Sequence, residues 1–177
     1  GARLVEVSAN GQQFSSSGVA FTYRPSSSVS SVWPSRGVSE GGTRVTVLGS
    51  GFSASAESAG ALRCRFNATS VVAAYVSESS VVCNTTASAA GYVPVEVSTN
   101  GHEYTSSGVR LRLVSLRVLD VQPWSGPVGG ATVVSVLAHG AWPGGLRCRF
   151  GEAAASAGWS GGASRLRCLT PPSGGMT

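Results

Sequence analysis

A pentapeptide with a central cysteine, LRCRF, occupies residues 62–66 and returns at residues 146–150. Each copy is followed roughly 20 residues later by a second cysteine, a spacing that predicts one internal disulfide per repeat. The expected pairs are Cys64 with Cys83 and Cys148 with Cys168. The chain is therefore expected to contain related modules, each crosslinked once.

Other segments repeat as well. Residues 5–19 (VEVSANGQQFSSSGV) match residues 95–109 (VEVSTNGHEYTSSGV), and residues 45–51 match residues 134–140. The turn residues Pro34, Gly37 and Gly41-Gly42 recur as Pro123, Gly126 and Gly129-Gly130. The period of about 85 to 90 residues is that of a small β-sandwich domain rather than of a short solenoid repeat.

Composition supports an all-β globular chain. With 42% hydrophobic and 12% charged residues, the chain has enough apolar material to bury a core and too little charge for a disordered protein. The 24 glycines, together with many Ser, Thr and Val, favour turns and short strands. No apolar stretch approaches the roughly 20 residues that cross a bilayer, and no signal-peptide pattern opens the chain. The segment is expected to be a processed or internal piece of a longer protein.

Alternating patterns place the expected strands. A hairpin is predicted from strands at 4–8 and 19–23 joined by an Asn10-Gly11 turn, followed by a Pro/Ser linker at 24–31. Turns are expected at Pro34 to Gly37 and at Gly41-Gly42, a loop at 53–60, and Phe52 in the core. About seven strands are expected in the next module, including 44–48, 62–66, 70–77, 80–83, 92–98 and 109–113.

All thirteen basic residues are arginines, and the net charge is +5. Arginines alternate with apolar residues in two of the expected strands, at Arg63 and Arg65 and at Arg110 and Arg112, so half-buried strands would direct them to solvent. The alternative is a surface that engages an acidic partner such as a polyanionic glycan.

No catalytic or metal-binding set is predicted. The four cysteines are candidate zinc ligands by type, but no C-x-x-C pair occurs and only His102 and His139 are available besides. Residues 37–41 match G-x-S-x-G by letters, yet a turn precedes and a strand follows, whereas a nucleophile elbow needs a strand before it and a helix after it. Asp120 is the only aspartate. We expect no enzyme activity, no metal and no cofactor.

Two N-glycosylation sequons occur, at Asn67 and Asn84. Asn67 aligns with Gly151, so its other expected role is to adopt a left-handed turn conformation, which Asn tolerates. Tryptophans at positions 33, 124, 142 and 159 are expected to fill core ends or module joints. Trp33 and Trp124 lie nearest the joints and are predicted to pack one module on its neighbour.

The order of these motifs resembles that of IPT/TIG domains, immunoglobulin-like modules of plexins, Met-type receptors, fibrocystin-like ciliary proteins and many algal and protist surface proteins. The matching motifs are P-x-x-G, G-G-T, V-x-V-x-G-x-G-F, C-x-F, a second Cys and V-x-V-S-x-N-G. Three departures occur: Ala131 replaces Thr, Ala141-Trp142 replaces Phe, and residues 84–87 (NTTA) stand where the other copy has T-P-P. The resemblance implies tandem immunoglobulin-like β-sandwiches and no catalytic residues.

The expected organisation has three parts. Residues 1–24 would be the C-terminal hairpin of a preceding IPT/TIG module, residues 32–114 a complete module, and residues 119–177 a module lacking its last strands. This layout is expected of a window in a long tandem array. The alternative is that residues 1–24 of one copy complete the 119–177 sandwich of another, giving a head-to-tail filament.

The resemblance and the disulfides indicate an extracellular or cell-surface array with a structural or adhesive role, on a cilium or flagellum among other surfaces. Its expected partners are other protein modules or chains of a surface assembly, and glycans, but neither nucleic acid nor the membrane itself. One alternative is an intracellular IPT module that dimerises and contacts DNA, as in Rel-like factors. Cysteine pairs, sequons and the absence of a basic stripe disfavour it. Another alternative is a carbohydrate-binding accessory domain, which needs exposed aromatic side chains on one face.

Overall fold

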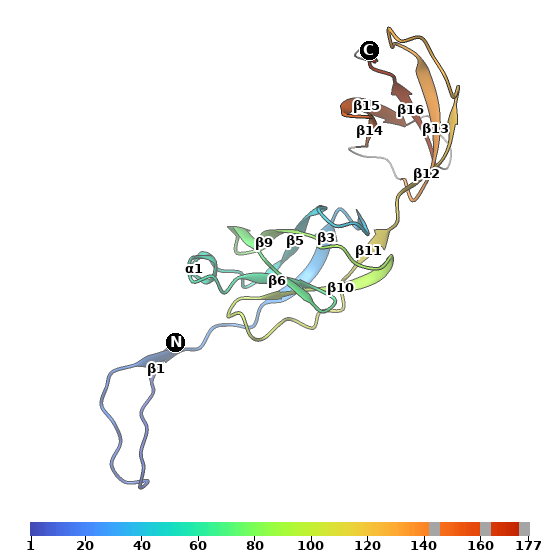
Figure 1. The fold of residues 1–177 in the computed structure, drawn as a ribbon. Coiled ribbons are helices and arrows are strands. Elements are labelled where there is room, and N and C mark those ends of the chain that lie inside the picture. The colour runs from blue at the N-terminus through green and yellow to red at the C-terminus, as the bar shows by residue number, and fades with distance from the viewer. Residues whose placement is uncertain (142–145, 160–163, 174–177) are drawn as a thin grey trace. The chain divides into compact units, whose positions relative to one another are not determined.

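The structure, a computed structural model, describes residues 1–141, 146–159 and 164–173 (Figure 1). Its described elements are β-strands apart from one short helix, so the all-β prediction is confirmed. By its internal contacts the chain divides into two compact units: residues 1–33, 46–83 and 94–109, and residues 34–45, 84–93 and 110–177.

The elements, in chain order, are β1 (Ala2–Leu4), β2 (Ala20–Thr22), β3 (Ser28–Trp33), β4 (Arg36–Val38), β5 (Arg44–Ser50), α1 (Ala54–Ser58), β6 (Arg63–Phe66), β7 (Thr69–Val72), β8 (Ala74–Ser77), β9 (Ser80–Asn84), β10 (Gly91–Ser98), β11 (Arg110–Val114), β12 (Arg117–Gln122), β13 (Val133–His139), β14 (Arg147–Phe150), β15 (Ala153–Trp159) and β16 (Arg165–Leu169). They form four sheets, ordered β1-β2, β3-β5-β9-β8, β4-β11-β10-β6-β7 and β12-β13-β16-β15-β14. We call β3 to β11 the first module and β12 to β16 the second module.

The hairpin at the N-terminus is a two-stranded sheet of its own. β1 and β2 pair antiparallel, with Leu4 opposite Ala20, and all six of their residues are exposed. The regular pairing ends earlier than predicted from the apolar pattern, which placed strands at 4–8 and 19–23. Beyond Leu4 the two arms are joined partly through side chains, since the Val7 N–H donates to Ser15 Oγ at 3.0 Å.

The predicted linker at 24–31 is wrong in its second half, because β3 begins at Ser28. Val29 is buried there, and its N–H donates to Ser107 Oγ at 2.9 Å. Three consecutive serines suggested the linker, but the last of them, Ser28, is a strand residue. Its hydroxyl is hydrogen-bonded, since Ser28 Oγ lies 2.9 Å from Ser50 Oγ of β5.

The segment expected as a loop at 53–60 contains the helix α1. Ser53 is its N-cap, and its hydroxyl accepts from the Ala56 N–H at 3.3 Å. Ser-capped alanines and a glutamate in the first turn are good helix material, but five residues are too few to show a helical period.

The single strand expected at 70–77 is two strands, β7 and β8, that belong to different sheets. The chain passes from one sheet to the other at Ala73, which is fully buried and whose N–H donates to Leu62 O at 3.1 Å. This change of sheet is one reason that β3 to β11 comprise nine strands rather than the seven expected.

Gly37, expected in a turn, lies in β4, which pairs parallel with β11. A Cβ at this position would lie 3.0 Å from Thr43 Oγ1 and 3.3 Å from Leu113 Cδ2, so the glycine allows a close approach rather than a turn. The tight turn at Gly41-Gly42 is confirmed, with φ of 85° and 76°.

Buried residues of the first module follow the alternation of its strands. Phe52 is buried, as predicted for the end of the strand that contains Val45 and Val47. The buried apolar residues of this module are Val29, Val45, Val47, Phe52, Ala56, Leu62, Cys64, Phe66, Ala73, Val81, Cys83, Val93, Val95, Val97, Leu111 and Leu113.

The second module has a smaller core, formed by Val134, Val136, Ala138, Leu166 and Cys168. The central strand β13 pairs with β12 on one side and β16 on the other. Trp142, expected to fill a core end, lies outside the described residues. Ala141, which stands where the first module has Phe52, packs partly buried against this core.

The turn before β13 repeats the turn before β5, bond for bond. The Gly42 N–H donates to Thr85 O at 2.7 Å, and the Ala131 N–H donates to Thr170 O at 2.9 Å. The next residue in each turn, Thr43 or Thr132, donates its N–H at 3.0 Å to the hydroxyl of the same threonine partner. The sequence alignment is therefore corrected by one residue: Ala131 replaces Gly42, and the threonine of G-G-T is retained as Thr132.

Candidate disulfides, modification sites and interaction surfaces

The four cysteines are bonded in the predicted pairs, Cys64 with Cys83 and Cys148 with Cys168. Cys64 lies in β6 and Cys83 in β9, so the first bond joins the two sheets of the first module. The second joins β14 to β16, which belong to one sheet. In the described part of the chain no cysteine is free, and no three His, Cys, Asp or Glu side chains gather as metal ligands.

Both sequon asparagines are exposed, Asn67 between β6 and β7 and Asn84 at the end of β9. Asn67 has φ of 55° and its counterpart Gly151 has φ of 59°, so the left-handed turn expected from the alignment is present. An exposed asparagine in a turn is accessible to a glycosyltransferase, and glycosylation remains a prediction.

Two of the four arginines in the alternating strands, Arg65 and Arg112, lie beside aromatic rings. The Arg65 guanidinium lies 4.1 Å from the centre of the Tyr104 ring, and that of Arg112 lies 5.9 Å from the centre of the Tyr92 ring. Arg112 is exposed and Arg65 is half-buried. These cation–π contacts hold the charges at the surface and are worth about 0.5–1 kcal/mol each at exposed sites.

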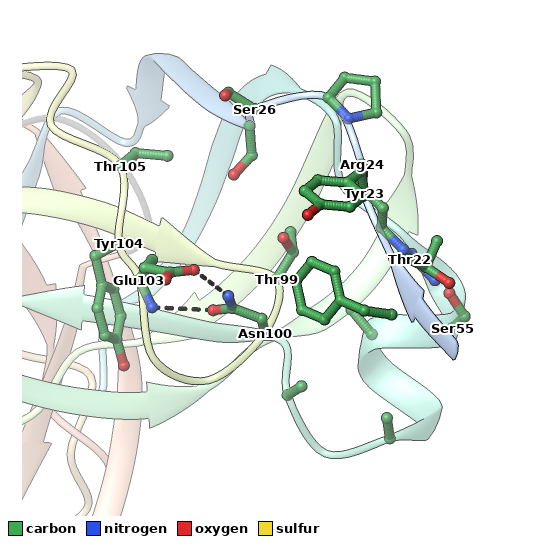
Figure 2. A pocket seen from close by; sticks show the side chains of 16 residues that line it. Thr22, Tyr23, Arg24, Ser26, Ser55, Thr99, Asn100, Glu103, Tyr104 and Thr105 are labelled. Carbon is green, nitrogen blue, oxygen red and sulfur yellow. Dashed lines mark hydrogen bonds between the residues drawn. The ribbon is translucent and has the colours of Figure 1, made fainter. Parts of the chain in front are cut away.

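A pocket of about 550 Å³ lies in the first compact unit (Figure 2). It is lined by residues 21–27, four residues of the segment 55–61, and residues 99, 100 and 103–105. On its wall Asn100 Oδ1 accepts from the Glu103 N–H at 2.9 Å, and the Asn100 amide also donates to the Glu103 carboxylate. The rings of Phe21 and Tyr23 meet edge to face, with centroids 4.9 Å apart. The Asn100 amide and the Glu103 carboxylate therefore bond each other rather than pointing free into the pocket.

The candidate catalytic residues are not brought together. The Asp120 carboxylate accepts from the Val121 N–H at 2.9 Å and from Gln122 Nε2 at 3.0 Å. Within residues 1–141, 146–159 and 164–173, neither histidine side chain bonds to it. The G-x-S-x-G letters at 37–41 run from β4 into a turn that leads to a strand.

Trp33 and Trp124 are exposed, with 72% and 90% of their surfaces accessible, so neither fills a core end. Sequence alone gave no sign of this, because an apolar residue beside a proline reads the same in a core or on a surface. Their role in packing between modules stays a prediction. Among the described residues, no helix has the length and apolar character needed to cross a bilayer.

Residues 27–112 match the family model of the IPT/TIG domain. This stretch is an IPT/TIG domain. The matched stretch begins one residue before β3 and ends within β11. No curated protein matches the sequence significantly.

Two solved structures of the plexin A4 full extracellular region share the fold. The one with domains 1 to 10 gives a TM-score of 0.60, and the one with domains 1 to 8 gives 0.63. Both are 20% identical to this chain over 84% of its length. The chain spans only 13% and 16% of those plexin chains, and at this identity the likeness concerns the fold.

Proposed function

We propose that this chain is a non-catalytic segment of an extracellular array of IPT/TIG modules, with a structural or adhesive role in a surface protein. The observation that carries the proposal is the repetition of one crosslinked unit: the same cysteine pentapeptide, the same turn bonds before β5 and β13, and one disulfide in each copy. A repeated rigid unit without a catalytic set suits a spacer or an adhesive stalk.

The disulfides favour an oxidising compartment, because cytosolic thiols are kept reduced. Two exposed sequons point the same way, since such sites are used only on the secretory route. In the proposed layout residues 1–24 belong to a preceding module, residues 32–114 form a complete one, and residues 119–177 begin the next. Two exposed tryptophans are the proposed contacts between neighbouring modules. Trp33 is the last residue of β3 in the IPT/TIG domain, and Trp124 follows β12, the first strand of the next module. Cilium or flagellum is the surface that the family resemblance suggests.

The alternative with an observation behind it is carbohydrate binding, since Tyr23 and Phe21 expose aromatic rings at the pocket of Figure 2. Aromatic rings beside amide and carboxylate groups are the kind of surface that sugars bind. The intramolecular Asn100–Glu103 bonds disfavour it, because the polar groups that would hold a sugar are already paired.

The deciding experiment is the intact mass of the native secreted chain, before and after reduction and glycosidase treatment. We expect two disulfides and hexose at Asn67 or Asn84. Asn67→Gly is the matched variant, because glycine at the aligned position 151 adopts the same left-handed turn, so the sequon is lost without loss of the fold. Four free thiols and bare asparagines would instead support the intracellular alternative.

A further inference from the structure

Three exposed arginines share one face of the first module: Arg36 on β4, and Arg110 and Arg112 on β11. β4 and β11 pair parallel, and the register sets Arg112 opposite Arg36. Arg110 and Arg112 are two residues apart on one strand, so their side chains point to the same side of the sheet. Leu111 and Leu113 point to the other side and are buried. The three guanidinium groups therefore stand together on the outer side of β4 and β11.

The charges on this face repel one another. Neighbouring strands lie about 5 Å apart, and residues two positions apart on a strand lie about 7 Å apart. Like charges that face each other across two strands destabilise a sheet. Every residue of the IPT/TIG domain is described, and no ion pair in the described chain includes any of these arginines. A bound anion would relieve the repulsion.

The neighbouring strand β10 has a single acidic residue, Glu96, and this carboxylate is already bonded. Glu96 is buried, and its Oε2 atom accepts from the Thr105 hydroxyl and from the Ser107 N–H, the latter at 3.3 Å. These bonds direct the carboxylate to the 105–107 segment.

An exposed aromatic ring lies beside the arginines. Tyr92 of β10 has 66% of its surface accessible, and the Arg112 guanidinium lies 5.9 Å from the centre of its ring. An exposed tyrosine offers a flat apolar ring together with a hydroxyl, so the apolar side of a sugar can pack on it. We call Arg36, Arg110, Arg112 and Tyr92 the arginine face. None of the four lines the pocket of Figure 2.

The repeated pattern does not require the arginine face. In the other copies, the residues at these positions are Ser125 for Arg36, Ala20 for Arg110, Thr22 for Arg112 and Ala2 for Tyr92. None of these four is charged or aromatic. Arg63 and Arg65, in contrast, recur as Arg147 and Arg149 and so belong to the repeated pattern. The arginine face is therefore particular to the IPT/TIG domain and calls for an explanation other than the fold.

Backbone hydrogen bonds support the alignment on which this comparison depends. The Val5 N–H donates to Val19 O at 2.7 Å, and the corresponding Val95 N–H donates to Val109 O at 2.9 Å. Residues 1–24 thus close the same hairpin with different side chains at the positions of the arginine face.

We propose that the arginine face binds a sulfated polysaccharide. A guanidinium group presents a planar fork of donors that fits the oxygens of an anionic group, and it keeps its charge at every physiological pH. A sulfated sugar chain carries closely spaced anionic groups on rings, so it matches both the arginines and the tyrosine. The inference rests on the proposed extracellular role and names a partner for it. An acidic polypeptide would match the charges but not the ring.

The test measures the affinity of the 177-residue chain for a heparin oligosaccharide at physiological salt. Arg36→Ser, Arg110→Ala and Arg112→Thr each introduce the residue of another copy. Each should weaken binding about tenfold, because a charge-assisted hydrogen bond is lost. Circular dichroism checks the fold of each variant, and the three substitutions are independent, so an unfolded variant leaves the other two to decide.

The matched control is Arg44→Val. It removes the same charge from an exposed position on β5, in the other sheet of the module, and valine stands at the aligned position 133. This variant should bind heparin as the wild type does. An equal loss in Arg44→Val and Arg112→Thr would mean that heparin responds only to the net charge of +5, and would overturn the proposal.

Polyglutamate serves as the acidic polypeptide probe. Tyr92→Ala should weaken heparin binding about threefold or more, on the scale of one aromatic contact, and leave polyglutamate binding unchanged, whereas Tyr92→Phe should retain heparin binding. A wild type that does not bind heparin, or that binds polyglutamate as tightly, would refute the proposal, and the second result would assign the face to an acidic protein. A chain with both disulfides and its glycans that does not bind heparin would leave the proposed function intact.

Discussion

The turn before the central strand of each module contains a residue in the left-handed backbone conformation. This residue is a glycine in one module and an alanine in the other, so exchanging the two residue types tests what that conformation costs. Gly42 has φ of 76°, and Ala131 occupies the same turn at φ of 62°. A Cβ placed on Gly42 would meet no atom within 4 Å, so Gly42→Ala changes backbone conformational energy without a clash. Ala131→Gly makes the opposite change in the second module.

The expected change in the free energy of unfolding is the difference between two opposing effects. Holding a residue with a Cβ in the left-handed region costs about 1–2 kcal/mol. Alanine in place of glycine returns about 0.4–1 kcal/mol, because the unfolded chain loses freedom. We therefore expect Gly42→Ala to lower the free energy of unfolding of its module by about 1 kcal/mol, and Ala131→Gly to raise that of the second module by a similar amount. For a domain of this size, 1 kcal/mol corresponds to a shift of about 4–8 °C in Tm.

The assay is urea unfolding followed by hydrogen exchange and mass spectrometry, which assigns each transition to peptides of one module. Gly41→Ala is the contrasting control, because its Cβ would lie 2.6 Å from the Ala87 N atom. This variant should therefore lose clearly more unfolding free energy than Gly42→Ala. Equal losses at Gly41 and Gly42, or a destabilised second module in Ala131→Gly, would refute the conformational argument.

Three further outcomes are expected. Replacing both Cys64 and Cys83 by alanine should cost about 3 kcal/mol in urea unfolding, from the 19-residue separation that the bond closes; a loss below half of that would contradict the loop-entropy account. Asn67→Gly should leave Tm unchanged and remove one glycan from the intact mass, whereas a large drop in Tm would show that the asparagine side chain is structural. Phe52→Ala should cost about 3–5 kcal/mol, because the ring is buried, and a near-neutral result would mean that the site collapses around the smaller side chain.

Much of the fold follows from the repeated segments. Three features are predictable: the cysteine pairs, the strands around Cys64 and Val47, and the left-handed turn at Asn67. They are predictable because the two aligned copies each limit the structures that a position can adopt. The corrected equivalence of Ala131 with Gly42 was not, since two adjacent glycines can be aligned in two ways and only the hydrogen bonds to Thr85 and Thr170 decide between them.

The features that sequence reasoning missed depend on contacts distant in the chain. Helix α1 is too short to show a period and is fixed by its Ser53 cap. The change of sheet at Ala73 has no local signal, because strands on either side of it look alike in sequence. The exposure of Trp33 and Trp124 likewise depends on what lies against each ring. The hydrogen bonds shared by the hairpins at residues 1–24 and 91–114 could be expected from their sequence identity. The exposure of the valines in the 1–24 hairpin is evident only from the structure.

The disulfides also determine how far each module lengthens under tension. A load applied through the ends of the IPT/TIG domain passes from Cys64 to Cys83 through sulfur, so the intervening strands carry no force even after the sheets separate. At about 3.3–3.6 Å per residue, the 19-residue separation withholds roughly 60 Å from the extended length. The second crosslink, with a separation of 20 residues, withholds a similar length. Under load, a stalk built from such units would lengthen in short steps. Strands β7 and β8 would stay within the loop closed by the disulfide, from which the module can refold.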